Sequence, residues 1–333
     1  MRYEHFLIHT DKLYYRLGDS LTTFNSGKPV FRTGINYQLA EATYIRSSWG
    51  QGYRFPSMAE LFITASQSGL EIFPNPSLKP ESGWSSEIGI KQGLKVRNWM
   101  GYIDLAAFIM QYDDMMEFTF AQYEAPEIDE NGETTNLFGT GFKSVNVGKT
   151  QISGVELSIS GYGKINNELN VNILAGYTYT KPISLNPEHT YAYDYSNQGL
   201  TYINSSSDST VLKYRYQHIA KFDAEINYKA LSFGAGFRYN DFMRNIDLIF
   251  TSKMVNEGAP EVGIDEGLVP GINDSREQQK NGDFIVDLRL GYQLNTNLRF
   301  GFVVNNLLNR EYMSRPADMR PPRTIAMQCS YKL

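Results

Sequence analysis

The chain has 333 residues and a formal net charge of −5, with 31 basic and 36 acidic side chains, one cysteine and four histidines. This balance leaves no basic field for nucleic acid. The single Cys329 excludes a disulfide framework, and the histidines share no metal-ligand spacing, so no cofactor is expected. No apolar run approaches the ~18 residues of a membrane-spanning helix, which excludes helical membrane proteins.

The composition favours an all-β protein. Aromatic residues make up 14% of the chain, with 23 Tyr and 19 Phe, and Gly is abundant at 28. Such residues are typical of strands and turns rather than helices. The mean hydropathy is −0.39, but a barrel strand faces lipid with only every second residue, so a membrane barrel remains compatible with this value.

Period-two alternation of apolar and polar residues recurs along nearly the whole chain and predicts strands with two different faces. An early apolar row contains Phe31, Ile35, Tyr37 and Leu39, and the last one runs from Ile325 to Leu333. About twelve strands are expected, at residues 2–9, 28–39, 42–50, 83–92, 97–119, 143–161, 168–183, 213–229, 230–245, 281–294, 297–306 and 323–333.

The predicted connections alternate strictly between short and long. Short turns are expected near Ala40-Glu41, Leu94-Lys95, Lys164-Ile165-Asn166-Asn167, Lys229-Ala230 and Asn295-Thr296. Long polar loops are expected near 10–27, 51–82, 120–142, 184–212, 246–280 and 307–322. Outer-membrane barrels alternate in this way because tight turns lie at the periplasmic rim and long loops lie outside. The pattern therefore predicts an antiparallel transmembrane β-barrel whose C-terminus lies at the periplasmic side.

A soluble β-sandwich or barrel gives the same alternation. Three features favour the membrane: several strands reach the ~9–11 residues of a tilted membrane strand, the polar faces carry charges of both signs, and aromatic residues recur near strand ends, where they form girdles. The candidate girdle residues are Tyr37, Trp49, Trp84, Trp99, Tyr177, Tyr228, Tyr239 and Tyr292.

Several motifs carry a family resemblance. The run Ser47–Phe62, SSWGQGYRFPSMAELF, resembles the strand-to-loop stretch s-x-G-Y-R-x-P-s-x-x-E-L-f of TonB-dependent receptors, and Pro74–Glu81 is similar to their N-P-x-L-K-P-E segment. Further similarities in the same order lie at Glu87 and Gly89, at Gly154-Val155-Glu156, at Val304–Tyr312, at Pro322-Arg323 and at Tyr331-Lys332-Leu333. One departure is Leu333, where the family usually has an aromatic residue that the barrel-assembly machinery reads.

The resemblance implies a barrel of about 22 strands around a globular plug, of which residues 1–333 supply about the last twelve strands. The plug, the N-terminal strands and the motif that engages the TonB system are then absent. Met1 opens directly on a strand-like run with no signal peptide, so we expect that it is not the true start. Missing strands leave two unpaired edges that lipid cannot satisfy.

Charged residues on the polar faces are candidates for the lumen. By the resemblance, they hold the plug or line the route past it; alternatively, they simply solvate the lumen. The set comprises Arg32, Arg46, Glu87, Lys91, Asp104, Glu156, Asp223, Glu225, Arg238, Asp287 and Arg289.

Tyrosines in the loop around 189–202 are candidates for ligand binding, because flat amphipathic rings stack on a catecholate, a corrin or a sugar. They are Tyr191, Tyr193, Tyr195 and Tyr202. Tyr53 and Arg54 lie at a strand–loop junction, where Arg54 could pair with an anionic ligand. Ordinary loop packing is the alternative for all six residues.

The acidic run Asp129–Glu133 suggests a Ca²⁺ site, but its spacing does not match a calcium loop, so a solvated turn is the better interpretation.

No arrangement of a nucleophile and a base indicates an enzyme, and His218 precedes a strand as an interfacial residue would. The resemblance implies energy-coupled uptake of a scarce, bulky ligand across the outer membrane of a Gram-negative bacterium. A ferric siderophore leads, with cobalamin, haem or an oligosaccharide as alternatives, and a capping surface lipoprotein is left open. Two other readings remain: a self-contained twelve-strand pore, and a soluble adhesin or carbohydrate-binding β-protein.

Overall fold

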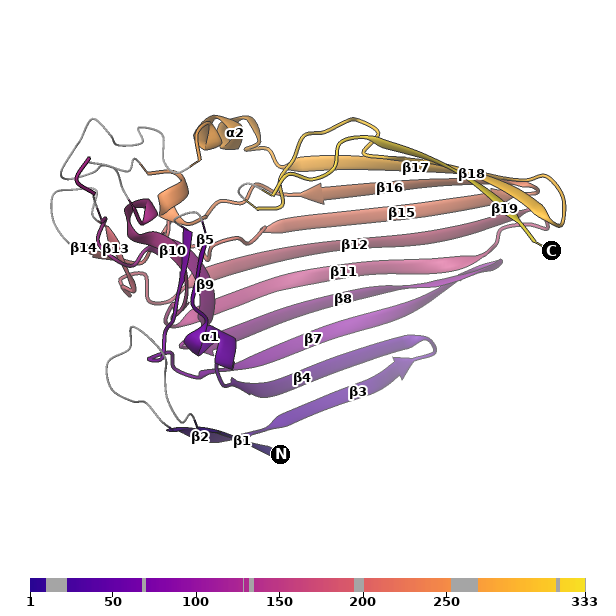
Figure 1. Cartoon of the computed structure of the whole chain (residues 1–333). Helices are drawn as coiled ribbons and strands as arrows, with labels where there is room; N and C mark the ends of the chain where they lie inside the picture. The colour runs from indigo at the N-terminus through magenta and orange to yellow at the C-terminus, as the bar shows by residue number, and fades with distance from the viewer. Residues whose placement is uncertain are drawn as a thin grey trace.

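A single large antiparallel sheet dominates the computed structural model, which describes residues 1–9, 23–67, 70–127, 129–131, 135–194, 201–252, 269–315 and 318–332. Eleven strands lie side by side in a curved wall (Figure 1). From one edge to the other they are β3 (Arg32–Ala40), β4 (Thr43–Arg54), β7 (Glu81–Val96), β8 (Asn98–Asp113), β11 (Thr150–Lys164), β12 (Leu169–Ser184), β15 (His218–Tyr228), β16 (Leu231–Asn240), β17 (Asp283–Gln293), β18 (Leu298–Asn305) and β19 (Thr324–Tyr331).

The first predicted strand, at residues 2–9, lies outside this sheet. β1 (Arg2–His9) pairs with β2 (Thr23–Val30), and Phe31 alone separates β2 from β3. The predicted all-β antiparallel architecture is therefore confirmed. Within the described residues the wall does not close, because β3 and β19 each have a partner on one side only.

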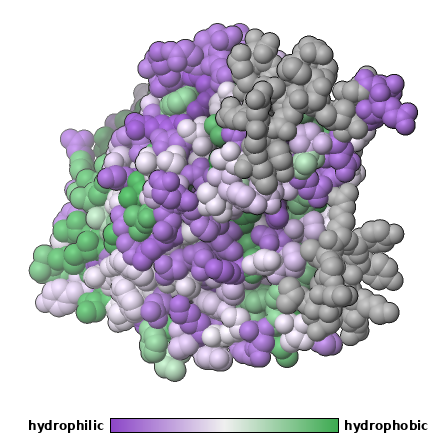
Figure 2. All heavy atoms as spheres, turned by 90° about the vertical axis from the view of Figure 1, so that its left-hand side faces the viewer, coloured by the Kyte–Doolittle hydropathy of each residue, from purple (hydrophilic) through white to green (hydrophobic). Residues whose placement is uncertain are grey.

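The two faces of the wall differ as the alternation predicts. Ile90, Leu105 and Leu157 lie side by side on β7, β8 and β11, and Leu105 is 47% exposed. We call this apolar side the outer face, because exposed aliphatic side chains on a strand suit contact with lipid. Viewed from the loop end, hydrophobic residues gather along the left edge of the molecule (Figure 2). All eight candidate girdle aromatics share the outer face: Tyr37, Trp49, Trp84, Trp99, Tyr177, Tyr228, Tyr239 and Tyr292.

The short turns lie where tight hairpins permit them, with one shift. Ala42 and Lys229 adopt positive φ in the turns after β3 and β15, as two-residue hairpins require. The turn expected at Leu94-Lys95 falls instead at Arg97, whose φ is 56°, because the pairing of β7 with β8 continues up to Val96 and Trp99. The C-terminus lies at the end that carries these turns (Figure 1).

The expected strands 213–229 and 230–245 extend five residues beyond β15 and β16 at the loop end. Two other expected strands are wrong in extent because each crosses from the wall into a second sheet. The span 97–119 breaks at Asp114, whose φ is 53°, and the span 143–161 breaks at Gly148, whose φ is 85°. Left-handed backbone at these positions turns the chain out of the wall. The segments beyond the breaks become β9 (Met116–Gln122) and β10 (Thr140–Asn146).

This second sheet lies across the long-loop end of the wall (Figure 1). Its order is β14 (Thr201–Ile203), β13 (Ala192–Asp194), β9, β10, β6 (Leu70–Phe73) and β5 (Ala65–Gln67). The loop end also contains α1 (Met58–Phe62), α2 (Ile272–Gln278), and the 3₁₀ turns η1 (Leu137–Gly139) and η2 (Leu248–Phe250). None of the helices in the described ranges is both long and apolar enough to cross a bilayer.

Buried apolar residues concentrate in this loop layer rather than along the wall. One cluster packs Phe73, Val145 and Leu212 on one side of β9 and β10, and another packs Phe120, Phe138 and Ile249 on the other side. The layer is thus a packed structure with its own cores, which the reading of the loops as polar connections did not predict.

Candidate functional site

The charged residues predicted for the lumen share the face opposite the apolar rows, which we call the inner face. The strand register places all of them on it, together with Ser48, Ser158 and Gly234. They are Arg32, Arg46, Glu87, Lys91, Asp104, Glu156, Asp223, Glu225, Arg238, Asp287 and Arg289.

Several of these charges are paired across neighbouring strands. Arg46 on β4 donates to Glu87 and to Asp104, each at 2.7 Å. Arg289 donates two hydrogen bonds of 2.8 Å to the two carboxylate oxygens of Asp223. The partners are a fifth to two fifths exposed, so each pair contributes only about 0–1 kcal/mol. Their main effect is a wall that is charged yet locally neutral.

The remaining inner-face charges differ in how they are engaged. Arg238 pairs with Asp287 at 3.0 Å, and Glu225 accepts from the Asn227 amide at 3.0 Å. The Arg32 side chain lies over Gly50, with its Cγ 3.2 Å from where a Cβ would stand. Glu156 is exposed on β11.

A hollow of about 570 Å³ lies in the inner face near the loop end, between β1, β3, β4, β7 and β8. No side chains rise from the part of its floor where Gly52 pairs with Gly83 across β4 and β7. A Cβ on Gly52 would meet nothing within 4 Å, whereas one on Gly83 would lie 2.3 Å from the carbonyl oxygen of Gln111. Arg32 and Arg54 are among the charged residues that line it. Because the carboxylates of Glu4 and Glu81 line it as well, the hollow has a polar lining of mixed charge.

The motif that begins at Tyr53 builds a helix start. Ser57 accepts from the backbone N–H of Glu60, and the Glu60 carboxylate accepts from the backbone N–H of Ser57, which is a reciprocal capping box. Arg54 donates to Glu60 at 2.8 Å. Burial opposes the change, but these hydrogen bonds lower the pKa of Glu60. Leu61 is fully buried beneath the helix.

Arg54 is thus engaged by its own chain, while Tyr53 points to the other side of β4. The Tyr53 hydroxyl contacts Ser26 on β2, and its ring lies 6.3 Å from that of Phe6. The strand places these two ligand-binding candidates on opposite faces of β4. The S-x-x-E spacing of Ser57 and Glu60 is a recognised sequence signal for a helix start, and it could have revealed the structural role of this segment.

The tyrosine loop forms a short hairpin of β13 and β14. Tyr193 and Tyr202 pair directly across it, with ring centroids 4.9 Å apart, and Tyr202 is 57% exposed. Tyr191 instead packs inward against the apolar cluster of Phe73 and its neighbours. Tyr195 lies outside the described residues. The structure therefore brings two of the four loop tyrosines together at the surface.

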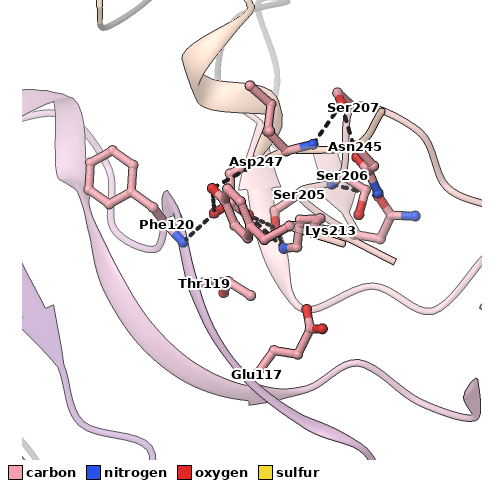
Figure 3. Close-up of polar contacts among 12 residues, drawn as sticks. Glu117, Thr119, Phe120, Ser205, Ser206, Ser207, Lys213, Asn245 and Asp247 are labelled. Carbon is pink, nitrogen blue, oxygen red and sulfur yellow. Dashed lines mark hydrogen bonds and ion pairs between the residues drawn. The ribbon is translucent and has the colours of Figure 1, made fainter. Parts of the chain in front are cut away.

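A buried polar cluster lies beside this hairpin, and we call it the loop hub: Asp247, Lys213, Ser205, Tyr191, Tyr214 and the backbone N–H of Phe120. Figure 3 shows Asp247 between Phe120 and Lys213. Lys213 donates to Asp247 Oδ1 at 2.6 Å, with the two side chains only 2% and 1% exposed. Neither Lys213, at the start of the predicted strand 213–229, nor Asp247, in the predicted loop 246–280, carried a sequence signal of burial, because isolated charged residues usually lie at the surface.

Burial and neighbouring charges both shift pKa values at the loop hub. Burial alone would lower the pKa of Lys213, but the adjacent Asp247 carboxylate outweighs it and raises that pKa. Nearby, burial raises the pKa of Glu117 against the pull of Lys213 and Arg215. Arg215 lies 3.7 Å from Glu117 Oε1, which makes no hydrogen bond to any described residue. The pKa of Lys213 and the pKa of Glu117 are therefore both raised, the first by neighbouring charges and the second by burial.

The other candidates yield little chemistry. Asp129 Oδ1 accepts from the backbone N–H of Asn131 at 2.9 Å, which forms a local turn, while Gly132 and Glu133 lie outside the described residues. His218 bonds the Tyr177 hydroxyl through Nδ1 at 2.7 Å on the outer face. In the part of the chain that the structure describes, no three His, Cys, Asp or Glu side chains cluster as a metal site.

Comparison with known proteins places these features in a family. Residues 1–307 match the family model described as TonB dependent receptor-like, beta-barrel. Among solved structures, the ferric-catecholate import receptor Fiu of Escherichia coli K12 shares 20% identity and a TM-score of 0.53, over 93% of this chain and 36% of that one. The receptor HasR of Serratia marcescens, solved with its hemophore HasA and heme, shares 16% identity and a TM-score of 0.54, over 99% and 46%.

A curated relative adds a different name. The probable hemoglobin and hemoglobin-haptoglobin-binding protein 4 of Haemophilus influenzae is 22% identical over 166 residues, which are 50% of this chain and 15% of that protein. The chain thus spans less than half of each of these proteins.

Proposed function

Because the chain belongs to the TonB-dependent receptor-like β-barrel family of Gram-negative outer-membrane proteins, we propose that it forms part of a receptor for energy-coupled uptake of a scarce, bulky ligand. The observation that carries the proposal is the wall itself. It has an apolar outer face, an inner face with paired charges, and a packed loop layer at one end. No covalent chemistry is required of such a wall.

We propose that the chain supplies about twelve strands of a barrel of about 22, with a plug and further strands contributed by additional polypeptide. Two observations support this. The described wall has two edges without a partner, and exposed backbone groups at such edges are unsatisfied in lipid. The solved relatives are also more than twice as long as the part matched here. Coupling to the TonB system would pass through that additional polypeptide.

The inner-face hollow and the paired charges suit contact with the plug. The hollow has a polar lining of mixed charge, and the ion pairs of Arg46 and Arg289 elsewhere on the inner face can exchange partners at little cost, because each contributes about 0–1 kcal/mol. A plug that is released by force needs such weak, polar contacts rather than a continuous apolar interface.

For the ligand we propose an iron chelate, with a ferric siderophore as the first candidate. The exposed Tyr193–Tyr202 pair offers flat rings of the kind that stack on aromatic groups. Haem is the second candidate, because the three curated relatives carry names that refer to haemoglobin binding. Both ligands are large, conjugated and scarce.

A titration of the outer-membrane protein in detergent tests the proposal, with haemin and an iron(III) catecholate complex as probes and tryptophan fluorescence as the signal. Removing the ring in Tyr202→Ala should weaken binding of one probe by roughly 2- to 12-fold, since an aromatic contact contributes about 0.5–1.5 kcal/mol. Tyr162→Ala is the matched control, because Tyr162 is 67% exposed on the inner face beside the turn after β11. Equal effects of the two substitutions, or no binding of either probe, would overturn the assignment.

A further inference from the structure

The loop hub joins three long loops that are far apart in sequence. Phe120 belongs to the loop between β8 and β11, Lys213 to the loop between β12 and β15, and Asp247 to the loop between β16 and β17. All three meet at one carboxylate, although Phe120 and Asp247 are 127 positions apart. The three loops start from different wall strands. They converge through the hydrogen bonds of the loop hub.

Asp247 is saturated by donors from the other two loops. Its Oδ1 accepts from Lys213 Nζ at 2.6 Å and from Ser205 Oγ at 3.3 Å. Its Oδ2 accepts from the Tyr214 hydroxyl at 2.7 Å and from the Phe120 backbone N–H at 3.0 Å. An ionised carboxylate has about four acceptor positions, and here each of them has a donor.

The hub also holds the base of the tyrosine hairpin. Tyr191 immediately precedes β13, and Ser205 follows shortly after β14. The Tyr191 hydroxyl accepts from Lys213 Nζ at 3.2 Å, and its oxygen lies 3.3 Å from Ser205 Oγ, whose single proton is donated to Asp247. The two arms of the hairpin that presents Tyr193 and Tyr202 are therefore fixed through Lys213 to Asp247.

A second set of contacts links β9 to both the Asp247 loop and the tyrosine hairpin. The Phe120 ring packs 5.4 Å from that of Phe250, which lies just after Asp247 in η2. Tyr193 pairs with Gln122 at the end of β9. Displacing Asp247 would therefore disturb β9 and the hairpin together.

We infer that Asp247 is a positioning residue that couples the three loops into one cooperative unit and thereby sets the placement of the Tyr193–Tyr202 surface. The reason is electrostatic. A charge that is almost fully buried must keep its partner, because either member left alone in the interior carries an uncompensated desolvation cost. No single loop can then open while the other two stay in place.

Hydrogen exchange of the outer-membrane protein, read by mass spectrometry without ligand, tests the coupling. In Asp247→Asn, exchange in residues 116–122, 192–194, 201–203 and 205–214 should rise together by at least tenfold, while exchange in β11 and β12 stays unchanged. The double variant Asp247→Asn with Lys213→Met, which buries no charge, should recover part of the protection. Asp208→Asn is the matched control, because the Asp208 carboxylate bonds Thr210 in its own loop.

Two results would overturn the inference. One is a rise confined to residues 241–252 while 116–122 keep their wild-type protection, which would mean that the loops open independently. The other is a double variant no better protected than Asp247→Asn, which would make the charge irrelevant. If Asp247→Asn fails to assemble, Ser205→Ala, which removes one neutral donor, should give the same pattern in weaker form; a purely local rise there counts against the coupling.

The consequence for the tyrosine surface rests on the proposed function, and the two can fail separately. Haemin and the iron(III) catecholate complex serve as probes of the wild type and of Asp247→Asn. If the loops uncouple but neither probe binds the wild type, the proposed function fails and the coupling stands. If a probe binds the wild type and Asp247→Asn equally well despite uncoupled loops, the positioning role is refuted.

Discussion

Replacing Leu105 with arginine should strongly destabilise the wall, whereas the same arginine at the neighbouring Ser158 should not. Leu105 lies midway along β8 between Trp99 and Gln111, and Gln111 pairs with Trp84. With ~3.4 Å per residue and a tilt of roughly 40°, it lies about 15 Å from each aromatic level, which is the middle of the apolar band. Its neighbours across the strands are Ile90 and Leu157.

The magnitude follows from that depth. An arginine at the bilayer midplane on the lipid side costs about 2–4 kcal/mol, which is roughly a 30- to 800-fold shift in the unfolding equilibrium. Ser158 is adjacent to Leu157 on β11, but it faces inward and pairs with Asp104. An arginine there would meet a carboxylate in a polar lumen, so we expect a change below about 1 kcal/mol.

The assay is urea unfolding of the outer-membrane protein in phospholipid vesicles, followed by tryptophan fluorescence. The two variants introduce the same side chain at nearly the same depth in the membrane. The difference between their unfolding midpoints therefore reports only which face of the wall carries the arginine. Equal midpoints for the two variants, or a lower midpoint for Ser158→Arg, would refute the assignment of outer and inner faces.

Three further predictions concern the hollow and the loop layer. Gly83→Val should destabilise the protein by about 1–3 kcal/mol in the same assay, because its Cβ would lie 2.3 Å from the Gln111 carbonyl oxygen. The control Gly52→Val should have almost no effect, because its Cβ would meet nothing within 4 Å. Equal effects of the two substitutions would contradict this prediction. Ser57→Ala should cost about 1 kcal/mol of local stability in α1, seen as faster exchange of residues 58–62, and unchanged rates would show that the cap contributes nothing. Burial raises the pKa of Glu117, so stability of the loop layer should fall as the pH rises from the ordinary carboxyl pKa to the raised one. Glu117→Gln should therefore protect residues 116–122 better at pH 8, and poorer protection would show that the Arg215 contact dominates.

The wall could be predicted from the sequence because its information is local. A strand that faces lipid on one side and a polar lumen on the other must alternate, so rows such as Leu169 to Tyr177 identify both the strand and its faces. The hairpin turns follow from the short gaps between such rows. Strands and faces can be assigned in this way without knowing which strands pair with each other.

The loop layer could not be predicted in the same way, because its contacts are long-range. Met116–Gln122 alternates much as a wall strand does, so only the left-handed backbone at Asp114 separates it from β8. Lys213 and Asp247 carry no local signal of burial. Tyr191 and Tyr202 looked equivalent in sequence, yet Tyr191 packs against the apolar cluster of Phe73 and Tyr202 is exposed.

The position of the loop hub has a consequence for how the protein folds. The wall hairpins join residues that are close in sequence, such as Val96 and Trp99, and closing such short loops costs little entropy. The contact of Phe120 with Asp247 must instead wait until the intervening hairpins are in place. We therefore expect the wall to assemble first and the loop layer to order last, so the extracellular surface matures only on a barrel that is already formed.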